Sequence, residues 1–179
     1  MAEVNTSRIW LHQFVFAMLG CFIMFLQLLP MDMRPEAWPA PDLLLAVTLV
    51  WVARRPEYAP VTTIAVVFLL TDLFFQRPPG LWAGMVVILT EFVRARSGSV
   101  RNMPLMLEWG MAALGVVALT ILYRIALTLV MIPQPPLGLS LIQMVMTILA
   151  YPLVVFVAHV LFGVTRPAPG AVDRLGHRI

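Results

Sequence analysis

Asp72-Leu-Phe-Phe-Gln-Arg-Pro-Pro-Gly-Leu81 is a short, charged and proline-marked break between two apolar runs. Proline fixes φ and lacks an N–H, while glycine accepts backbone conformations that other residues avoid, so Pro78 to Gly80 predict a tight turn. Asp72 lies near the end of the run 65–75, where no other residue is charged. If lipid surrounds such a helix, its carboxylate is the first candidate for a functional or fold-defining group.

The composition indicates an integral membrane protein. Hydrophobic residues make up 61% of the 179 residues and charged residues only 12%, whereas soluble domains carry about 25% charged residues. The mean hydropathy is +0.91, and in water so apolar a chain would expose large hydrophobic patches. The basic side chains are 12 arginines with no lysine, scattered between apolar runs. This scatter disfavours nucleic-acid binding, which needs clustered basic residues.

Six apolar runs predict a bundle of six transmembrane helices in one domain, residues 1–165, followed by a polar cytoplasmic tail, residues 166–179. At 1.5 Å per residue the first run reaches about 31 Å, enough to cross a bilayer core. The second run, 42–53, is short. A hairpin that returned inside the membrane would place Arg54 and Arg55 within the bilayer, at an insertion cost of about 2.5–3.5 kcal/mol for each arginine. We therefore predict a short span whose arginines reach the opposite surface. The runs are 9–29, 42–53, 62–75, 81–95, 104–132 and 139–164.

The arginines predict the orientation of the six spans. An even number of spans places both termini on one side, and most arginines share that side, with only Arg34 and Arg77 opposite and Arg124 inside a span. Because loops rich in arginine stay in the cytoplasm, both termini are predicted to be cytoplasmic. The arginines on that side are Arg8, Arg54, Arg55, Arg94, Arg96, Arg101, Arg166, Arg174 and Arg178.

Asp42, Asp72 and Arg124 are expected to form an intramembrane polar cluster toward the outer face. Arg124 lies about 12 Å from the outer end of its predicted helix. An arginine at this depth is tolerable when it faces the bundle and meets a carboxylate. We expect Arg124 to pair with Asp72, with Asp42 as the other candidate partner; the alternative is that Arg124 reaches the outer headgroups. Asp42 also lies at a helix start, where a carboxylate suits the helix dipole.

The sequence predicts neither an enzyme nor a metal or cofactor site. No Ser/His/Asp or Cys/His arrangement and no glycine-rich phosphate loop is recognisable. Asp42 and Asp72 could in principle form a paired-aspartate protease site, but neither lies in a glycine-flanked helical motif. Four other candidate ligands are expected toward the cytoplasmic face, yet they come from four spans and lack metal-ligand spacing: His12, Glu91, Glu108 and His159.

Two motifs resemble the MreD family of rod-shape-determining membrane proteins. Pro41-Asp42-Leu-Leu-Leu, followed by Trp51-Val-Ala-Arg-Arg-Pro56, is similar to the second span of that family and contains Arg54 and Arg55. Asp72-Leu73 is followed at the family's spacing by the residues of its third-to-fourth span turn, Pro78, Gly80 and Leu81. The resemblance covers residues 41–96. It departs from the family at Gln76-Arg77 and Trp82, where small residues are common.

The resemblance implies a non-enzymatic membrane scaffold of the bacterial cell-elongation (Rod) complex, located in the inner membrane. Such a protein binds the single membrane helix of MreC, which couples cytoplasmic MreB filaments to the RodA glycosyltransferase and a class B penicillin-binding transpeptidase. The fold it implies is an α bundle similar to the substrate-binding S component of energy-coupling-factor vitamin transporters. An S component is therefore the alternative function, although its usual Ala-x-x-x-Ala coupling face is matched only partly by Ala17-Met-Leu-Gly-Cys21.

Overall fold

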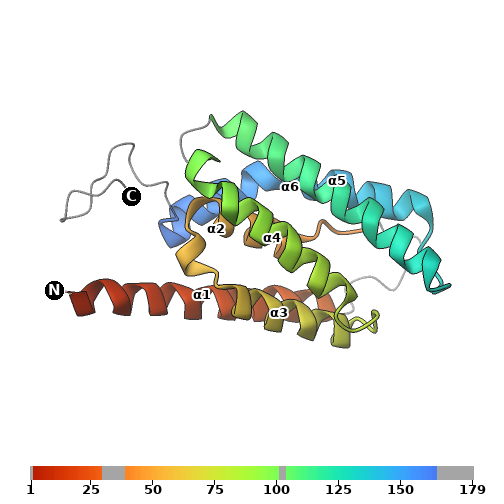
Figure 1. The fold of residues 1–179 in the computed structure, drawn as a ribbon, viewed down its shortest axis with the longest axis horizontal. Helices are drawn as coiled ribbons and strands as arrows, with labels where there is room; N and C mark the ends of the chain where they lie inside the picture. Colours follow the sequence, from red (N-terminus) through yellow and green to blue (C-terminus); the bar gives the residue numbers. More distant parts are fainter. Residues whose placement is uncertain (1, 30–38, 101–103, 165–179) are drawn as a thin grey trace.

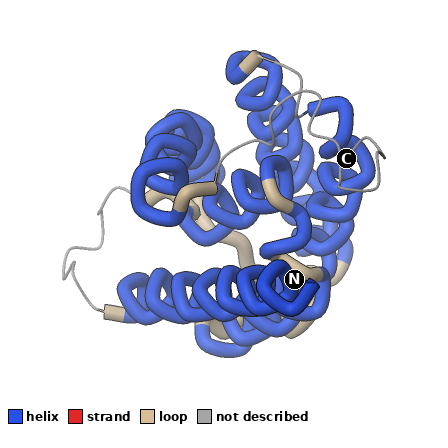
Figure 2. The backbone as a smooth tube through the Cα atoms, turned by 90° about the vertical axis from the view of Figure 1, so that its left-hand side faces the viewer, coloured by secondary structure: helices blue, strands red, loops and turns tan. Residues whose placement is uncertain are grey.

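The computed structural model describes residues 2–29, 39–100 and 104–164, and all the elements in these ranges are helical (Figure 2). Each of the six predicted apolar runs forms one α-helix, which confirms the all-α prediction, while the predicted tail 166–179 lies outside the described residues. The elements are α1 (Ala2–Leu28), α2 (Leu43–Arg54), the short 3-10 helix η1 (Pro56–Tyr58), α3 (Val61–Phe74), α4 (Leu81–Val100), α5 (Leu105–Leu129) and α6 (Leu137–Phe162).

Successive α-helices run in opposite directions along the long axis of the bundle (Figure 1). One end, here called the near end, contains the start of α1, the α2–α3 connection, the end of α4, the start of α5 and the end of α6. The other, the far end, contains the start of α2, the turn between α3 and α4 and the connection between α5 and α6. The described chain therefore enters and leaves the bundle at the same end.

Helix α2 is the centre of the bundle. It packs against α1, α4 and α6, and every residue from Leu44 to Arg54 is buried. Apart from Thr48 and the terminal Arg54, its sequence is apolar around the whole circumference, as expected of a helix that faces protein on most sides. Twelve residues give only about 18 Å of helix, but α2 does not have to match the thickness of a bilayer because its neighbours enclose it.

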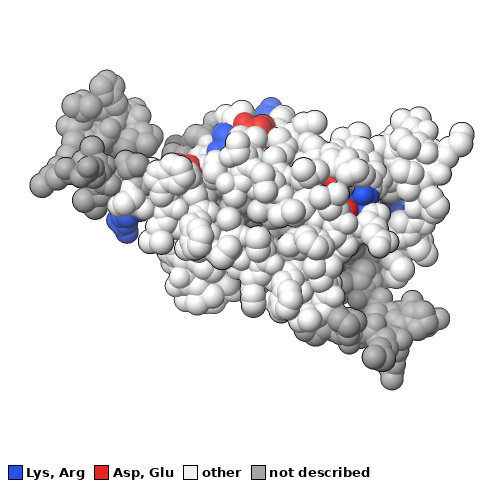
Figure 3. Space-filling model, turned by 90° about the horizontal axis from the view of Figure 1, so that it is seen from below, with Lys and Arg blue, Asp and Glu red and all other residues white. Residues whose placement is uncertain are grey.

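The outer surface of the bundle has the character of a membrane protein. Three of the described helices are long and apolar enough to cross a membrane, namely Ser7–Leu28 within α1, α5 and α6. Large apolar side chains cover their outward faces, including Trp10 at 68% exposure, Leu114 at 70% and Leu161 at 70%. Figure 3 shows a mostly uncharged face on which charged side chains occupy a few small patches. In water such a surface would drive aggregation, so these faces indicate a lipid environment.

A proline interrupts the hydrogen bonds of α6 without ending the helix. Pro152 lies inside α6 and has no N–H, so the carbonyl of Ile148, four residues earlier, loses its helical partner. Trp109 in α5 donates its indole N–H to that carbonyl, with an Nε1–O distance of 2.9 Å. The indole thus replaces the missing backbone donor and joins α5 to α6 at the same point.

We expect Trp109→Phe to lower the free energy of unfolding by about 1–2 kcal/mol, because the Ile148 carbonyl then lacks a partner. Thermal unfolding of the detergent-solubilised protein measures this loss, with Trp10→Phe on the exposed face of α1 as the control. In a Pro152→Ala background the carbonyl regains its helical donor, and the cost of Trp109→Phe should shrink. An equal cost in both backgrounds would contradict this role of the indole.

Candidate functional site

Asp72 caps the helix that follows its own. It is fully buried near the end of α3, and its Oδ2 accepts hydrogen bonds from the backbone N–H groups of Gly80 at 3.0 Å and Ala83 at 3.1 Å. These donors belong to the first turn of α4 and its flanking residue, where backbone N–H groups have no helical acceptors. A carboxylate is stabilised there by the helix dipole as well as by the bonds. Asp72 therefore joins α3 to α4 through the turn.

The turn itself depends on two residues with positive φ. Gly80 has φ +82°, a conformation that side chains disfavour, which agrees with its predicted role in the turn. Gln76 has φ +54° just after the end of α3, and the N–H of Arg77 bonds to the carbonyl of Asp72 at 2.9 Å. This closes α3 with a Schellman-type cap, with glutamine in the place that glycine usually takes. Pro78 and Leu81 complete the turn, the N–H of Leu81 bonding to the Pro78 carbonyl at 3.1 Å.

Asp42 caps the start of the central helix. Its Oδ1 accepts the N–H of Leu45 at 2.9 Å, the N-cap arrangement expected of a carboxylate at a helix start. Its own backbone N–H donates to Thr147 Oγ1 in α6 at 2.9 Å, and Gln143 in α6 donates to the carbonyl of Ala40 at 3.3 Å. Pro41 lies between these anchored residues, so the family-like motif marks the point where α6 holds the start of α2.

The predicted ion pair between Arg124 and Asp72 is wrong, and so is the alternative pair with Asp42. Arg124 Nη1 instead donates to Ser140 Oγ at 2.7 Å and to the carbonyl of Pro135 at 3.3 Å. Helix α5 ends at Leu129, so Arg124 lies close enough to the helix end to bond the connection to α6. The two carboxylates are bound by helix N-termini, which supply donors without needing a second side chain at the same depth.

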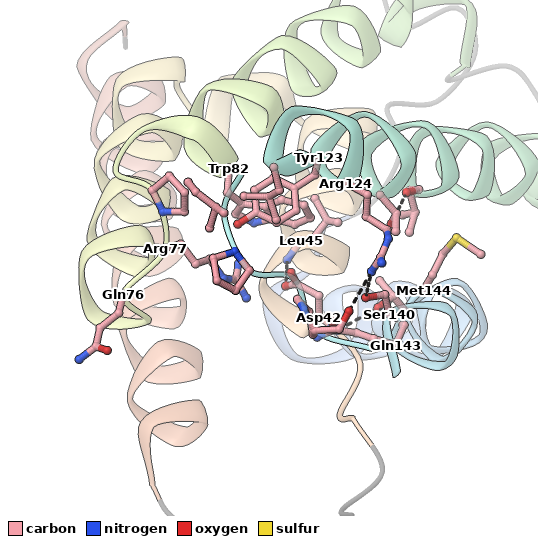
Figure 4. Close-up of a pocket in the computed structure, with 18 residues that line it drawn as sticks. Asp42, Leu45, Gln76, Arg77, Trp82, Tyr123, Arg124, Ser140, Gln143 and Met144 are labelled. Atoms are coloured by element: carbon pink, nitrogen blue, oxygen red, sulfur yellow. Dashed lines mark hydrogen bonds between the residues drawn. The ribbon is translucent and has the colours of Figure 1, made fainter. Parts of the chain in front are cut away.

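A pocket of about 240 Å³ lies at the far end, and Asp42 and Arg124 are among the residues that line it. In Figure 4, Arg77 and Arg124 approach it from opposite sides in the view shown, while Gln76 points away. Its polar lining comes from the start of α2, the α3–α4 turn, α5 and α6, and consists of Asp42, Gln76, Arg77, Thr120, Tyr123, Arg124, Ser140, Gln143 and Thr147. The far end thus combines charged, hydroxyl and amide groups around an open space.

At the near end, a buried ion pair joins α2 to α5. Arg54 Nε lies 3.0 Å from Glu108 Oε1, and Arg54 Nη2 lies 3.3 Å from Glu108 Oε2, so the contact is bidentate. The hydroxyl of Tyr151 in α6 donates to Glu108 Oε1 at 2.9 Å. Arg54 is 8% exposed and Glu108 2%, so the prediction that Arg54 reaches the surface is wrong. A bidentate guanidinium–carboxylate contact with an extra donor is the geometry that makes a buried pair tolerable.

Arg55 and Arg94 secure the connection between α2 and α3. Arg55 is half-buried and pairs with Glu57 at 3.3 Å, so only the second arginine of the predicted surface pair remains near the surface. Arg94 in α4 donates to the carbonyls of Pro56 and Ala59, both at 2.6 Å, and to Glu91 Oε1 at 2.7 Å. Its guanidinium therefore binds the backbone of the connection that contains the family-like Pro56.

Three of the four near-end groups considered as metal ligands, His12, Glu91 and Glu108, serve other contacts, and His159 is exposed. In the described part of the chain, no group of three or more His, Cys, Asp or Glu side chains could hold a metal ion. His12 stacks on Tyr58, with ring centroids 4.1 Å apart, and Glu108 binds Arg54. Sequence reasoning missed the Arg54–Glu108 pair, although both residues were expected at the same end of the bundle with opposite charges.

No family model, curated protein or solved structure matches the chain.

We expect Glu108→Ala to lower the free energy of unfolding by about 3–5 kcal/mol, because the Arg54 guanidinium is left buried without its counter-ion. Thermal unfolding in detergent measures the loss. The matched control is Arg54→Met with Glu108→Leu, which removes both charges at similar volume and should be closer to wild type than Glu108→Ala. A double variant less stable than Glu108→Ala would contradict the view that the unpaired charge sets the cost.

Asp72→Ala should lower the free energy of unfolding by about 2 kcal/mol, because Gly80 and Ala83 lose a charged acceptor at the start of α4. The charge exchange Asp72→Arg with Arg124→Asp should be no more stable than Asp72→Arg alone. Detergent unfolding curves of the three variants measure both effects. Recovery of stability by the exchange would restore the ion-pair hypothesis.

Proposed function

We propose that the chain is a non-enzymatic, MreD-like membrane scaffold of the bacterial cell-elongation complex, and that it binds the single membrane helix of MreC. Through MreC it would connect indirectly to MreB filaments, to RodA and to its penicillin-binding transpeptidase, and so help to position peptidoglycan synthesis. This proposal rests on the resemblance of residues 41–96 to the MreD family, and three features of the structure support it.

The observation that carries the proposal is that the motif residues build the fold. Asp72 and Gly80 meet in one hydrogen bond across the α3–α4 turn, and Asp42 caps α2. Arg54 ends α2 and binds Glu108, and Pro56 lies in the connection between α2 and α3, where Arg94 binds its carbonyl. These groups mostly bind backbone atoms or a counter-ion, although the buried Asp72 Oδ1 has no hydrogen-bond partner among the described residues. Such contacts suit a structural protein better than a site of bond-making chemistry.

The second supporting feature is the distribution of charge along the bundle. The near end contains Arg8, Arg54, Arg55, Arg94 and Arg96, whereas Arg77 and Arg124 lie toward the far end. With the near end in the cytoplasm, this distribution follows the positive-inside rule. We therefore propose six spans in the inner membrane, with both termini cytoplasmic. The short helix α2 would cross while surrounded by the neighbouring helices instead of by lipid.

The third supporting feature is an apolar groove between α4 and α5. It has a volume of about 390 Å³ and is lined by methionine, leucine, isoleucine, valine, phenylalanine and small residues. Gly115 belongs to its lining, and an added Cβ there would be only 2.9 Å from Leu89 Cδ1, so the Leu89 side chain of α4 packs directly against this glycine of α5. Membrane helices associate through close packing against such small residues. We place the helix of MreC in this groove.

The alternative function, an S component of an energy-coupling-factor vitamin transporter, is favoured by one observation. The pocket at the far end is open to a polar group, and an S component captures its small molecule from outside. The scaffold remains our preferred proposal because the Ala-x-x-x-Ala coupling face of the first span is matched only partly.

Crosslinking separates these possibilities. In a Cys21→Ser background, Ile88→Cys and Leu114→Cys place a thiol on exposed residues of the groove, and we expect both to crosslink to cysteines in the MreC membrane helix. Phe14→Cys and Phe22→Cys, exposed on α1, are the matched controls and should not crosslink. Co-purification of an ATP-binding-cassette module with a bound vitamin, and no MreC, would contradict the scaffold and support the S component.

A further inference from the structure

Two guanidinium groups beside the far-end pocket are short of hydrogen-bond partners. Arginine offers five N–H donors, yet Arg124 uses only Nη1, toward Ser140 and Pro135, among the described residues. The guanidinium of Arg77 makes no hydrogen bond within the described chain and lies 5.4 Å from the ring centroids of both Phe75 and Trp82. Both arginines are half-buried and line the pocket, so the donors that make no hydrogen bond within the described chain are available to a ligand there.

The remaining lining fits an anionic oxygen ligand. The charged side chains in the pocket wall are Arg77, Arg124 and Asp42, so the lining itself carries two cations and one carboxylate. The neighbouring carboxylate of Asp72 lies outside the lining and is bound by the N–H groups of Gly80 and Ala83. Asp42 already accepts the N–H of Leu45, so the positive end of α2 partly offsets its carboxylate. The hydroxyls of Tyr123 and Ser140 can donate to the same ligand. Arginine forks match the oxygen geometry of phosphate in particular.

Size and position restrict the ligand further. A pocket of about 240 Å³ is smaller than the roughly 300–1,000 Å³ that enclose drug-sized ligands, so it suits a single polar group. It lies at the far end, beside the α3–α4 turn and the α5–α6 connection. In a bundle that crosses a bilayer, this end is at the level of the headgroups.

We propose that the far-end pocket binds a phosphate group, held between Arg77 and Arg124, and that this group belongs to the headgroup of a membrane phospholipid. The same oxygen chemistry could come from a free phosphate ester, and the experiment distinguishes the two sources. This inference goes beyond the scaffold function, because the pocket lies away from the α4–α5 groove and needs no partner protein.

The test measures thermal unfolding of the full chain in detergent with three additives. Dioleoyl phosphatidylglycerol should raise the melting temperature, while dioleoylglycerol, which has the same acyl chains without phosphate, should not. Glycerol 3-phosphate is the soluble arm: a matching rise with this compound would assign the pocket to a free phosphate ester and overturn the lipid assignment. A rise with the phospholipid alone supports it.

Variants then connect the effect to the pocket. Arg77→Gln and Arg124→Gln should each weaken phospholipid binding by about tenfold, measured from the lipid concentration that gives half of the shift, because each removes a charged donor. Arg77→Lys and Arg124→Lys keep the charge and should weaken binding less. Arg96→Gln is the matched control, since Arg96 lies over Phe92 at the near end, and it should bind as wild type does.

Two results would overturn the proposal. One is an equal shift of the melting temperature with dioleoylglycerol and with phosphatidylglycerol. The other is wild-type phospholipid binding by both single variants, Arg77→Gln and Arg124→Gln. If the glutamine variants fail to fold, the lysine variants decide: they must retain a phosphate-dependent shift that is smaller than that of wild type. Crosslinking to MreC is a separate readout, so failure here leaves the scaffold proposal standing and the reverse also holds.

Discussion

A short helix buried on every side constrains the whole bundle. Every residue of α2 from Leu44 to Arg54 is buried, so the unpaired backbone groups at its ends and its terminal charge need partners from the surrounding protein. At its start, Asp42 supplies a side-chain acceptor and Thr147 of α6 accepts the Asp42 N–H. At its end, Glu108 of α5 and Tyr151 of α6 surround Arg54. These contacts join α5 and α6 to the two ends of α2.

The polar side chains inside this protein mostly complete backbone hydrogen bonds. Asp72 accepts the N–H groups that begin α4, Arg94 donates to the carbonyls after α2, and Trp109 donates to the carbonyl that Pro152 leaves open. In an apolar surrounding an unsatisfied backbone group costs several kcal/mol, as an unpaired charge does. A charged side chain that bonds backbone groups at a helix end, as Asp72 and Arg94 do, reduces both costs together, whereas the uncharged Trp109 satisfies a backbone carbonyl within α6.

The two ends of the bundle differ in how completely their charges are paired. At the near end, Arg54 and Arg94 have carboxylate and carbonyl partners at short distances. At the far end, Arg77 and Arg124 border an open pocket and retain unused donors among the described residues. A closed near end is suited to stability, whereas an open far end can accept a ligand. The apolar groove between α4 and α5 is a separate surface, suited to a membrane helix.

The sequence by itself determined the helical class and the six helices, because apolar runs divided by prolines and charges leave few alternatives in lipid. It also indicated that Asp42 begins a helix and that Gly80 makes a turn, since both are local properties of the backbone. The tertiary structure alone decided which charges meet. Pairing Arg54 with Glu108 rather than Arg124 with Asp72 depends on how helices rotate and slide against one another, and a sequence pattern carries no measure of that. The central place of α2 was likewise a result of packing, because a fully apolar helix reads the same whether lipid or protein surrounds it.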